Sequence, residues 1–90
     1  MYKISASTRF KKDLKVAIKR GQNISLLNTV VGILAAGQTL DASYLDHPLK
    51  GEYKGCRECH ITPDWLLIYE IENEELILHL TRTGTHSDLF

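Results

Sequence analysis

The 90-residue sequence has no net charge, only two cysteines and no long hydrophobic run. No stretch approaches the roughly 20 apolar residues that a membrane-spanning helix requires. Residues 1–12 turn polar at Ser5 and contain no hydrophobic segment of a signal peptide, so we expect a cytosolic protein without membrane contact. Cysteines in the cytosol are ordinarily reduced, which argues against a structural disulfide.

The zero net charge hides an asymmetry along the chain. Residues 1–40 carry seven Lys or Arg and one Asp, whereas residues 41–90 carry four Lys or Arg and ten Asp or Glu. Neutrality taken alone argues against a nucleic-acid partner. A concentrated basic segment can nevertheless form a local anion-binding face, because salt screens charges beyond about 10 Å. A solvated helix face explains the same charges, so both interpretations stay open.

The amino-terminal half predicts a strand followed by two helices. Residues 2–6 alternate apolar and polar side chains, as a short strand does. Residues 7–21 place apolar side chains at helical spacing, with the bases pointing outward and Gly21 as the stop. Asn23 can cap a second helix, which carries a broad apolar face and ends at Gly37. The short link at Gly21 favours an antiparallel helix pair.

The carboxy-terminal half predicts a loop and three strands. Residues 38–52 have no sustained period and contain Pro and Gly, as expected of a long loop. Strand patterns follow at residues 53–61, 65–71 and 75–82. We therefore expect one α+β domain over residues 1–90 in the order β-α-α-β-β-β, with an antiparallel sheet packed against the amino-terminal helix pair.

Cys56, Cys59 and His60 match C-x-x-C-H, the pattern of covalent haem attachment. Side chains alternate along a strand, so Cys56 and His60 would share one face while Cys59 points to the other. A cytochrome also needs a second axial ligand, often Met, and the only methionine is Met1. A structural zinc site normally shows a second, closely spaced ligand pair, which this sequence lacks. A metal or redox module on the two cysteines is kept as an alternative.

A set of polar residues in the same half fits the needs of metal-independent RNA cleavage. That reaction requires a base for the ribose 2′-hydroxyl, a cation for the charged phosphorane and an acid for the leaving 5′-oxygen. Imidazoles titrate near neutral pH, and a guanidinium stays charged and matches phosphate oxygens. Taken singly, each residue also has a structural explanation as a loop, turn or surface residue. The set consists of His47, His60, Asp64, Arg82 and His86.

The motif order at these residues resembles the YafQ branch of the RelE/ParE toxin superfamily. The matching pattern is "DHPLKG.YKG.R..H..PDW.LIY" from Asp46 to Tyr69, followed by "RTGTHSDLF" at the end. The resemblance implies a RelE-like fold and the toxin of a bacterial type II toxin–antitoxin pair. It implies an endoribonuclease without a cofactor that cuts mRNA, typically on the translating ribosome. It also implies a cognate antitoxin that wraps the toxin, and operator DNA bound only through the antitoxin complex.

The resemblance assigns expected roles to the matching residues. His86 is the expected general acid, and His60 or Asp64 the expected base, with His47 assisting. Arg82 would stabilise the phosphorane. A non-catalytic toxin of the same superfamily, similar to the ParE branch and acting by protein binding, is the main alternative. Such a binder has no need of this set of side chains.

Five further residues are candidates for substrate contact. Phe90 could stack on or orient a base. Lys50, Lys54 and Arg57 could contact phosphates, although solvated charges explain them nearly as well. Trp65 begins a strand, where a core aromatic and an RNA-stacking platform both fit.

Overall fold

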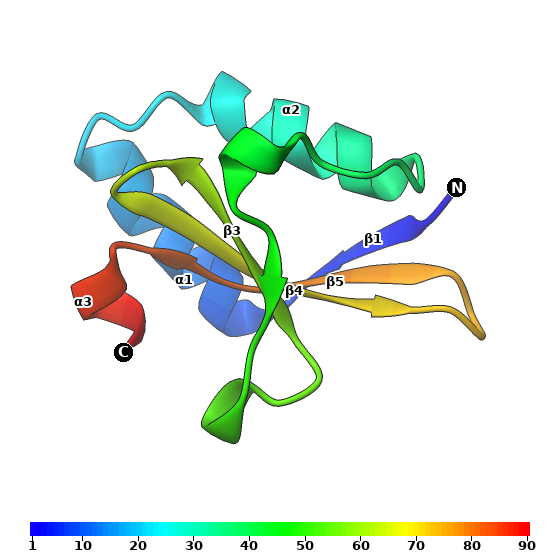
Figure 1. Cartoon of the computed structure of the whole chain (residues 1–90). Helices are drawn as coiled ribbons and strands as arrows, with labels where there is room; N and C mark the ends of the chain where they lie inside the picture. The colour runs from blue at the N-terminus through cyan, green and yellow to red at the C-terminus, as the bar shows by residue number, and fades with distance from the viewer.

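The computed structural model describes all 90 residues and contains a five-stranded sheet with helices packed on it (Figure 1). This α+β architecture confirms the predicted fold class. The elements in chain order are β1 (Lys3–Ala6), α1 (Thr8–Lys19), α2 (Ile24–Ala35), the 3-10 turn η1 (Ala42–Tyr44), β2 (His47–Pro48), the 3-10 turn η2 (Gly51–Tyr53), β3 (Arg57–Thr62), β4 (Trp65–Glu72), β5 (Ile77–Gly84) and α3 (His86–Leu89).

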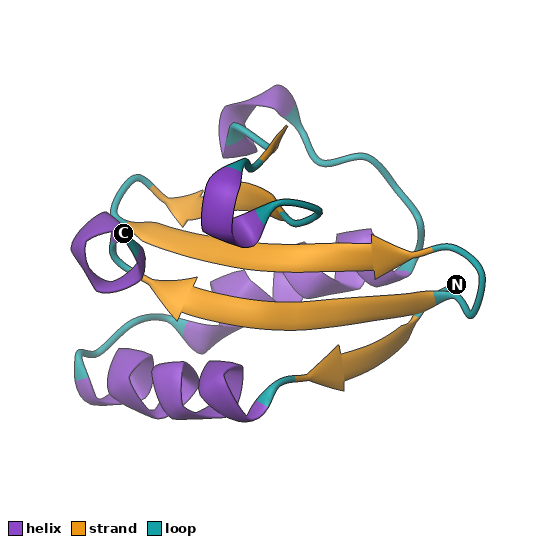
Figure 2. Cartoon of the chain, turned by 90° about the horizontal axis from the view of Figure 1, so that it is seen from below, coloured by secondary structure: helices purple, strands orange, loops and turns teal.

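The strands lie side by side in the order β1-β5-β4-β3-β2 (Figure 2). All neighbours from β2 to β5 are antiparallel, as predicted. The pair β1–β5 is parallel, with Lys3 opposite Ile77. Parallel neighbours require a crossover connection, and here the chain between β1 and β5 includes both long helices. The alternation of side chains within β1 carries no information about its direction relative to β5.

The helices begin and end at the residues that the sequence indicated. Ser7 caps α1 by accepting a hydrogen bond from the amide of Phe10, and Asn23 caps α2. Gly21, between the two helices, has a φ of 82°, a conformation that favours glycine. Both helices pack on the sheet, where α1 contacts mainly β5 and α2 contacts β3. Neither helix is long and apolar enough to cross a membrane.

The predicted loop 38–52 contains the short strand β2, and two strand boundaries differ from the expected ones. The predicted strand 53–61 starts only at Arg57, because residues 51–53 form η2 and Gly55 has a φ of 95°. The last strand covers Ile77–Gly84 where residues 75–82 were predicted, because the turn before it contains Leu76 at a φ of 55°. Turn residues of this kind interrupt strand pairing without changing the apolar pattern.

The central strand β4 is buried on both faces. Leu67 and Tyr69 face α1 and α2 in the larger core cluster. Leu66 and Ile68 point the other way, where they form a second cluster with Leu89 of α3. The carboxy-terminal end of the chain therefore packs on the sheet face opposite the two long helices.

Candidate active site

Strand register places four side chains in one row across the sheet face opposite α1 and α2, which we call the site face. His47 on β2 is opposite Glu58 on β3, and Glu58 is opposite Ile68 on β4. Ile68 is in turn opposite Arg82 on β5. Adjacent strands are about 4.8 Å apart, so the row spans roughly 14 Å from β2 to β5. It brings two of the predicted residues onto one surface from segments distant in sequence.

Glu58 lies between the two predicted histidines of β2 and β3. Its Oε1 atom is 3.5 Å from Nε2 of His47 and 3.8 Å from Nε2 of His60. The Glu58 side chain is only 8% exposed, and its Oε2 atom is buried without a hydrogen-bond partner. A carboxylate thus joins His47 and His60 into one group of titratable side chains.

The His47 ring is fixed by a second contact. Its Nδ1 atom is 2.7 Å from the carbonyl oxygen of Leu45, and a carbonyl can only accept a hydrogen bond. Nδ1 therefore carries a proton, and Nε2 faces Glu58. The contact between Nε2 and the carboxyl group is attractive only when one of the two carries a further proton. His47 and Glu58 are thus held beside each other at one end of the row.

Arg82 sits at the other end of the row and is held by α1. Its Nε and Nη2 atoms donate to the Asp13 carboxylate at 2.8 and 3.1 Å. Its Nη1 atom is 3.3 Å from the Tyr53 hydroxyl oxygen. These bonds raise the pKa of Arg82 above its already high usual value. A guanidinium has five N–H donors, so one remains free on each terminal nitrogen for a phosphate oxygen.

Asp13 has a further task at the edge of the sheet. Because β1 ends at Ala6, opposite Leu80, residues 81–84 of β5 have no strand beside them on the β1 edge. The Asp13 carboxylate accepts the backbone N–H of Thr83 there at 3.1 Å. The same carboxylate therefore satisfies an edge-strand donor and orients Arg82.

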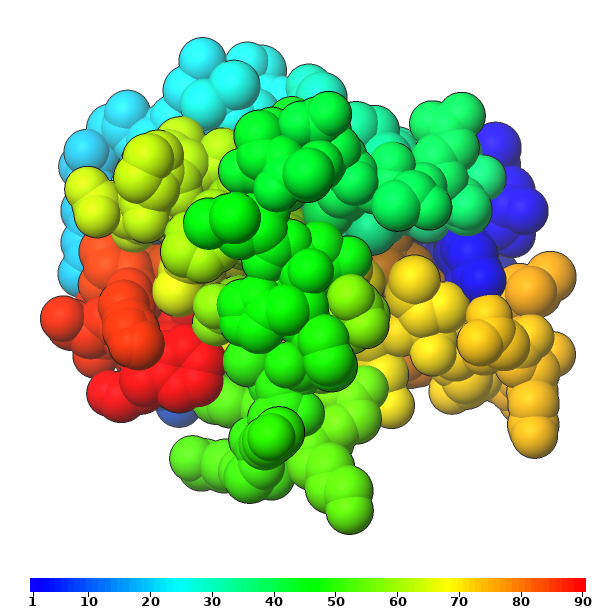
Figure 3. Space-filling model, in the orientation of Figure 1, coloured from blue at the N-terminus to red at the C-terminus, as the bar shows by residue number.

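The carboxy-terminal residues lie beside this row. The rings of His86 and Phe90 pack at a tilt of 45° with centroids 4.9 Å apart, and Tyr53 contacts Phe90 edge-on at 5.6 Å. The Tyr53 hydroxyl donates to the carbonyl of Leu89 and also contacts Arg82, which links α3 to β5. Figure 3 shows the red carboxy-terminal segment next to the green segment that contains β2 and η2. His86, Phe90 and Arg82 thus belong to one neighbourhood.

Asp64 occupies the exposed turn between β3 and β4. No hydrogen bond or ion pair joins it to either histidine, and Glu58 stands beside them instead. Figures 1 and 2 both place the β3–β4 turn at the end of the sheet that carries α3. The turn that contains Asp64 therefore lies at the same end of the sheet as α3.

The other predicted contact residues fall into two groups. Lys50 and Lys54 flank η2 on an exposed loop beside the site face and are free to meet a substrate. Arg57 points to the helix side of the sheet, opposite Tyr69, and donates to Asp46. This ion pair lies away from the site face.

Trp65 packs as a core aromatic. The side chain is 1% exposed and belongs to the larger core cluster, so it offers no surface for stacking. Of the two interpretations of Trp65, the structure selects the core one.

Cys56 and Cys59 lie on opposite faces of the sheet. Cys59 is fully buried in the larger cluster, and Cys56 packs against the smaller one, as strand alternation predicted. Burial raises the pKa of Cys59 to about 12. No three or more His, Cys, Asp or Glu side chains are grouped so as to hold a metal ion. Because the two thiols lie on opposite faces of the sheet, they do not form a joint ligand pair.

This placement predicts the reactivity of the thiols. At pH 8 we expect one slowly reacting thiol per folded chain with a disulfide reagent and two after denaturation. With a pKa of about 12, Cys59 is a thiolate in only about one molecule in 10,000 at that pH, and the thiolate is the reactive form. The Cys59→Ser variant should leave the native count unchanged. Equal, rapid reaction of both thiols in the folded protein would contradict the buried position.

Sequence reasoning missed three residues of this site, namely Glu58, Asp13 and Tyr53. Glu58 could have been predicted from the sequence, because alternation along the strand places its side chain on the same face as that of His60. The evidence for Asp13 was weaker, namely that it is the only acidic residue in the basic segment 1–40. Nothing in the sequence indicated that Tyr53 would contact the end of the chain.

The sequence matches a known protein family over nearly its whole length. The chain matches the family described as "Bacterial toxin of type II toxin-antitoxin system, YafQ" over residues 2–90. The mRNA interferase toxin YafQ of Escherichia coli K12 is 41% identical over 88 residues, which cover 97% of this chain and 94% of that protein.

Solved structures give the same result. A crystal structure of the E. coli DinJ–YafQ complex contains a chain of 40% identity that superposes with a TM-score of 0.91, covering 100% of this chain and 99% of that one. A crystal structure of a metal-bound toxin from Helicobacter pylori has 51% identity and a TM-score of 0.93 with full coverage of both chains. The chain therefore belongs to the YafQ family of bacterial toxins of type II toxin–antitoxin systems.

Proposed function

We propose that the protein is an endoribonuclease that cuts mRNA without a metal ion, using the site face. The relative from E. coli is named an mRNA interferase. The observation that carries the proposal is the row across the sheet, with proton-accepting groups at one end and a fixed guanidinium at the other. Phosphoryl transfer by 2′-hydroxyl attack needs these two chemistries on either side of the phosphate.

The proposed reaction uses the group of Glu58, His47 and His60 as the base. One member takes the proton of the 2′-hydroxyl, and O2′ forms a bond to phosphorus. The free N–H groups of Arg82 stabilise the charge that develops on the phosphate oxygens. His86 donates a proton to O5′ as the P–O5′ bond breaks. The products are a 2′,3′-cyclic phosphate and a 5′-hydroxyl end.

Several supporting roles belong to the same proposal. Phe90 would stack on a base beside His86, and Lys50 and Lys54 would contact neighbouring phosphates. Asp64 stays a candidate base in the β3–β4 turn. Arg57 and Trp65 are left out because neither faces the substrate.

The partners follow from the same assignment. We propose that a cognate antitoxin covers this site, as a DinJ–YafQ complex has been solved for the E. coli relative. The exposed lysines Lys11, Lys12 and Lys15 of α1 would bind RNA phosphates of the ribosome. Operator DNA would be bound through the antitoxin complex.

A cleavage assay in EDTA tests the proposal. We expect the purified protein to cut an RNA oligonucleotide into a 2′,3′-cyclic phosphate product, and a 2′-deoxy substitution at the cut position to block the reaction. Glu58→Gln should slow cleavage about 100-fold, because the base group loses its carboxylate. Glu74→Gln, an exposed carboxylate in the β4–β5 turn, is the matched control. Toxicity without any RNA cleavage would favour a binder similar to the ParE branch.

A further inference from the structure

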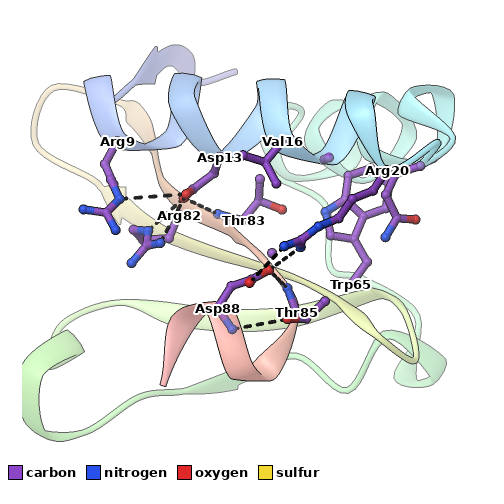
Figure 4. A pocket seen from close by; sticks show the side chains of 12 residues that line it. Arg9, Asp13, Val16, Arg20, Trp65, Arg82, Thr83, Thr85 and Asp88 are labelled. Carbon is purple, nitrogen blue, oxygen red and sulfur yellow. Dashed lines mark hydrogen bonds and ion pairs between the residues drawn. The ribbon is translucent and has the colours of Figure 1, made fainter.

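An ion pair joins the end of α1 to the end of the chain (Figure 4). The Nη1 atom of Arg20 donates to Oδ2 of Asp88 at 2.6 Å, and Nη2 donates to Oδ1 at 3.3 Å. Arg20 lies just beyond α1, and Asp88 lies in α3. The contact connects residues 68 positions apart in sequence. It is the direct hydrogen-bonded link between α1 and α3.

Asp88 also builds α3 itself. Its carboxylate accepts the backbone N–H of Thr85 at 2.9 Å, while the Thr85 hydroxyl accepts the N–H of Asp88 at 3.2 Å. This reciprocal capping box closes a helix of only four residues. A single helical turn is not stable alone, because the conformational entropy lost in forming it exceeds the stabilisation from its one or two hydrogen bonds. The Arg20 guanidinium and the Thr85 amide hold the pKa of Asp88 well below its usual range, so the carboxylate is charged at neutral pH.

The Asp88 side chain packs directly against Gly84, which has no side chain of its own. A Cβ atom at this position would lie 2.9 Å from Oδ2 and 3.0 Å from Cβ of Asp88. Contacts this short force one of the groups to move, and the Cβ of Asp88 can move only with α3. The last residue of β5 therefore has to be small for Asp88 to reach both Arg20 and Thr85.

The anchored helix carries the proposed acid. His86 is the first residue of α3 and is exposed, and none of the side-chain hydrogen bonds involves its ring. Its position depends on the backbone of α3 and on the contact with Phe90. Anything that loosens α3 therefore displaces the imidazole.

We propose that Arg20 and Asp88 are positioning residues, which hold α3 so that His86 reaches the leaving 5′-oxygen. This inference rests on the proposed function of His86 as the acid. Arg20 and Arg82 line the same pocket, and the two bonds from Arg20 to Asp88 hold its guanidinium against α3. Misplacement of a reacting group by about 1 Å can cost about 100-fold in rate.

The test compares Arg20→Gln with Lys19→Gln. Both variants remove one exposed positive charge from the end of α1, but only the first breaks the contact with Asp88. We expect Arg20→Gln to lower kcat about 10- to 100-fold with KM changed less than about twofold. Lys19→Gln should stay within about twofold of the wild type in both constants. Arg20→Lys should recover part of kcat, because it restores one charged donor.

Amide hydrogen exchange supplies a second readout that needs no activity. Arg20→Gln and Gly84→Ala should both speed exchange of the amides of residues 88–90, and Lys19→Gln should not. A rise in KM with unchanged kcat would overturn the proposal and make Arg20 a phosphate contact. Unchanged kcat together with unchanged exchange would overturn it as well.

The two proposals fail in different ways. If the wild type cuts no RNA, or if His86→Gln cuts as fast as the wild type, the proposed function fails. The exchange data then still decide whether Arg20 anchors α3. If His86→Gln is inactive and Arg20→Gln is fully active, the proposed function stands and the positioning role is wrong.

Discussion

Replacement of His86 by glutamine is expected to lower kcat for RNA cleavage by about 100- to 10,000-fold, the usual contribution of a general acid. Glutamine can still form hydrogen bonds but cannot transfer a proton at neutral pH. Because the His86 side chain is exposed, the melting temperature should change little. A steady-state assay in EDTA and a thermal melt of the same preparation measure both quantities.

A substrate with sulfur in place of the 5′-bridging oxygen shows whether His86→Gln is slow because it lacks a proton donor or for another reason. A thiolate leaves without protonation, so His86→Gln should cut this substrate nearly as fast as the wild type does. The control His79→Gln changes a histidine of β5 that pairs with Glu72 at 3.2 Å, outside the site, and should be active on both substrates. Equal losses of His86→Gln on the two substrates would exclude His86 as the acid.

Replacement of Arg82 by lysine is expected to lower kcat about 100- to 1,000-fold, the range seen when one stabilising donor of a transition state is removed. Lysine keeps the positive charge beside Asp13, so the fold should remain intact. It lacks the planar fork, which here holds Asp13 with one edge and leaves donors free on the terminal nitrogens. The same assay and melt measure the outcome.

Arg9 on α1 provides the matched control for Arg82. Its Nε atom is 3.9 Å from Asp13, and its side chain is 66% exposed. Arg9→Lys should therefore keep kcat within about twofold, since a solvated ion pair of this kind contributes little. Full activity of Arg82→Lys would show that a point charge suffices and would contradict the proposed use of the fork. Arg82→Ala is less informative, because it leaves the mostly buried Asp13 carboxylate without its main partner.

Much of the fold was predictable because it depends on local patterns. The apolar spacing of α1 and α2, with Ser7 and Asn23 as caps, is readable from neighbouring residues alone. The alternation along β3 also predicted correctly that Cys59 and His60 face opposite sides. The parallel pairing of β1 with β5 was not predictable in this way, because it depends on the path of the connection between them.

The candidate site was predictable in its residue types but not in its pairings. His47, His60, Arg82 and His86 stood out by their chemistry and by the resemblance to a family. Their partners did not, since an aspartate in a basic helix has no local feature that points to a strand 70 residues away. Trp65 was ambiguous for the same reason, because its burial depends on which elements cover β4.

The sequence by itself determined the two long helices, four of the five strands, the family and the set of side chains able to move protons and bind a phosphate. Only the tertiary structure decided that Glu58 would join His47 and His60, that Asp13 would orient Arg82, and that Arg57 would be used elsewhere. The physical reason is that hydrogen-bonded register and helix packing bring together residues that are distant in sequence. Those contacts exist only once β2, β5 and α1 have taken their places around β3 and β4.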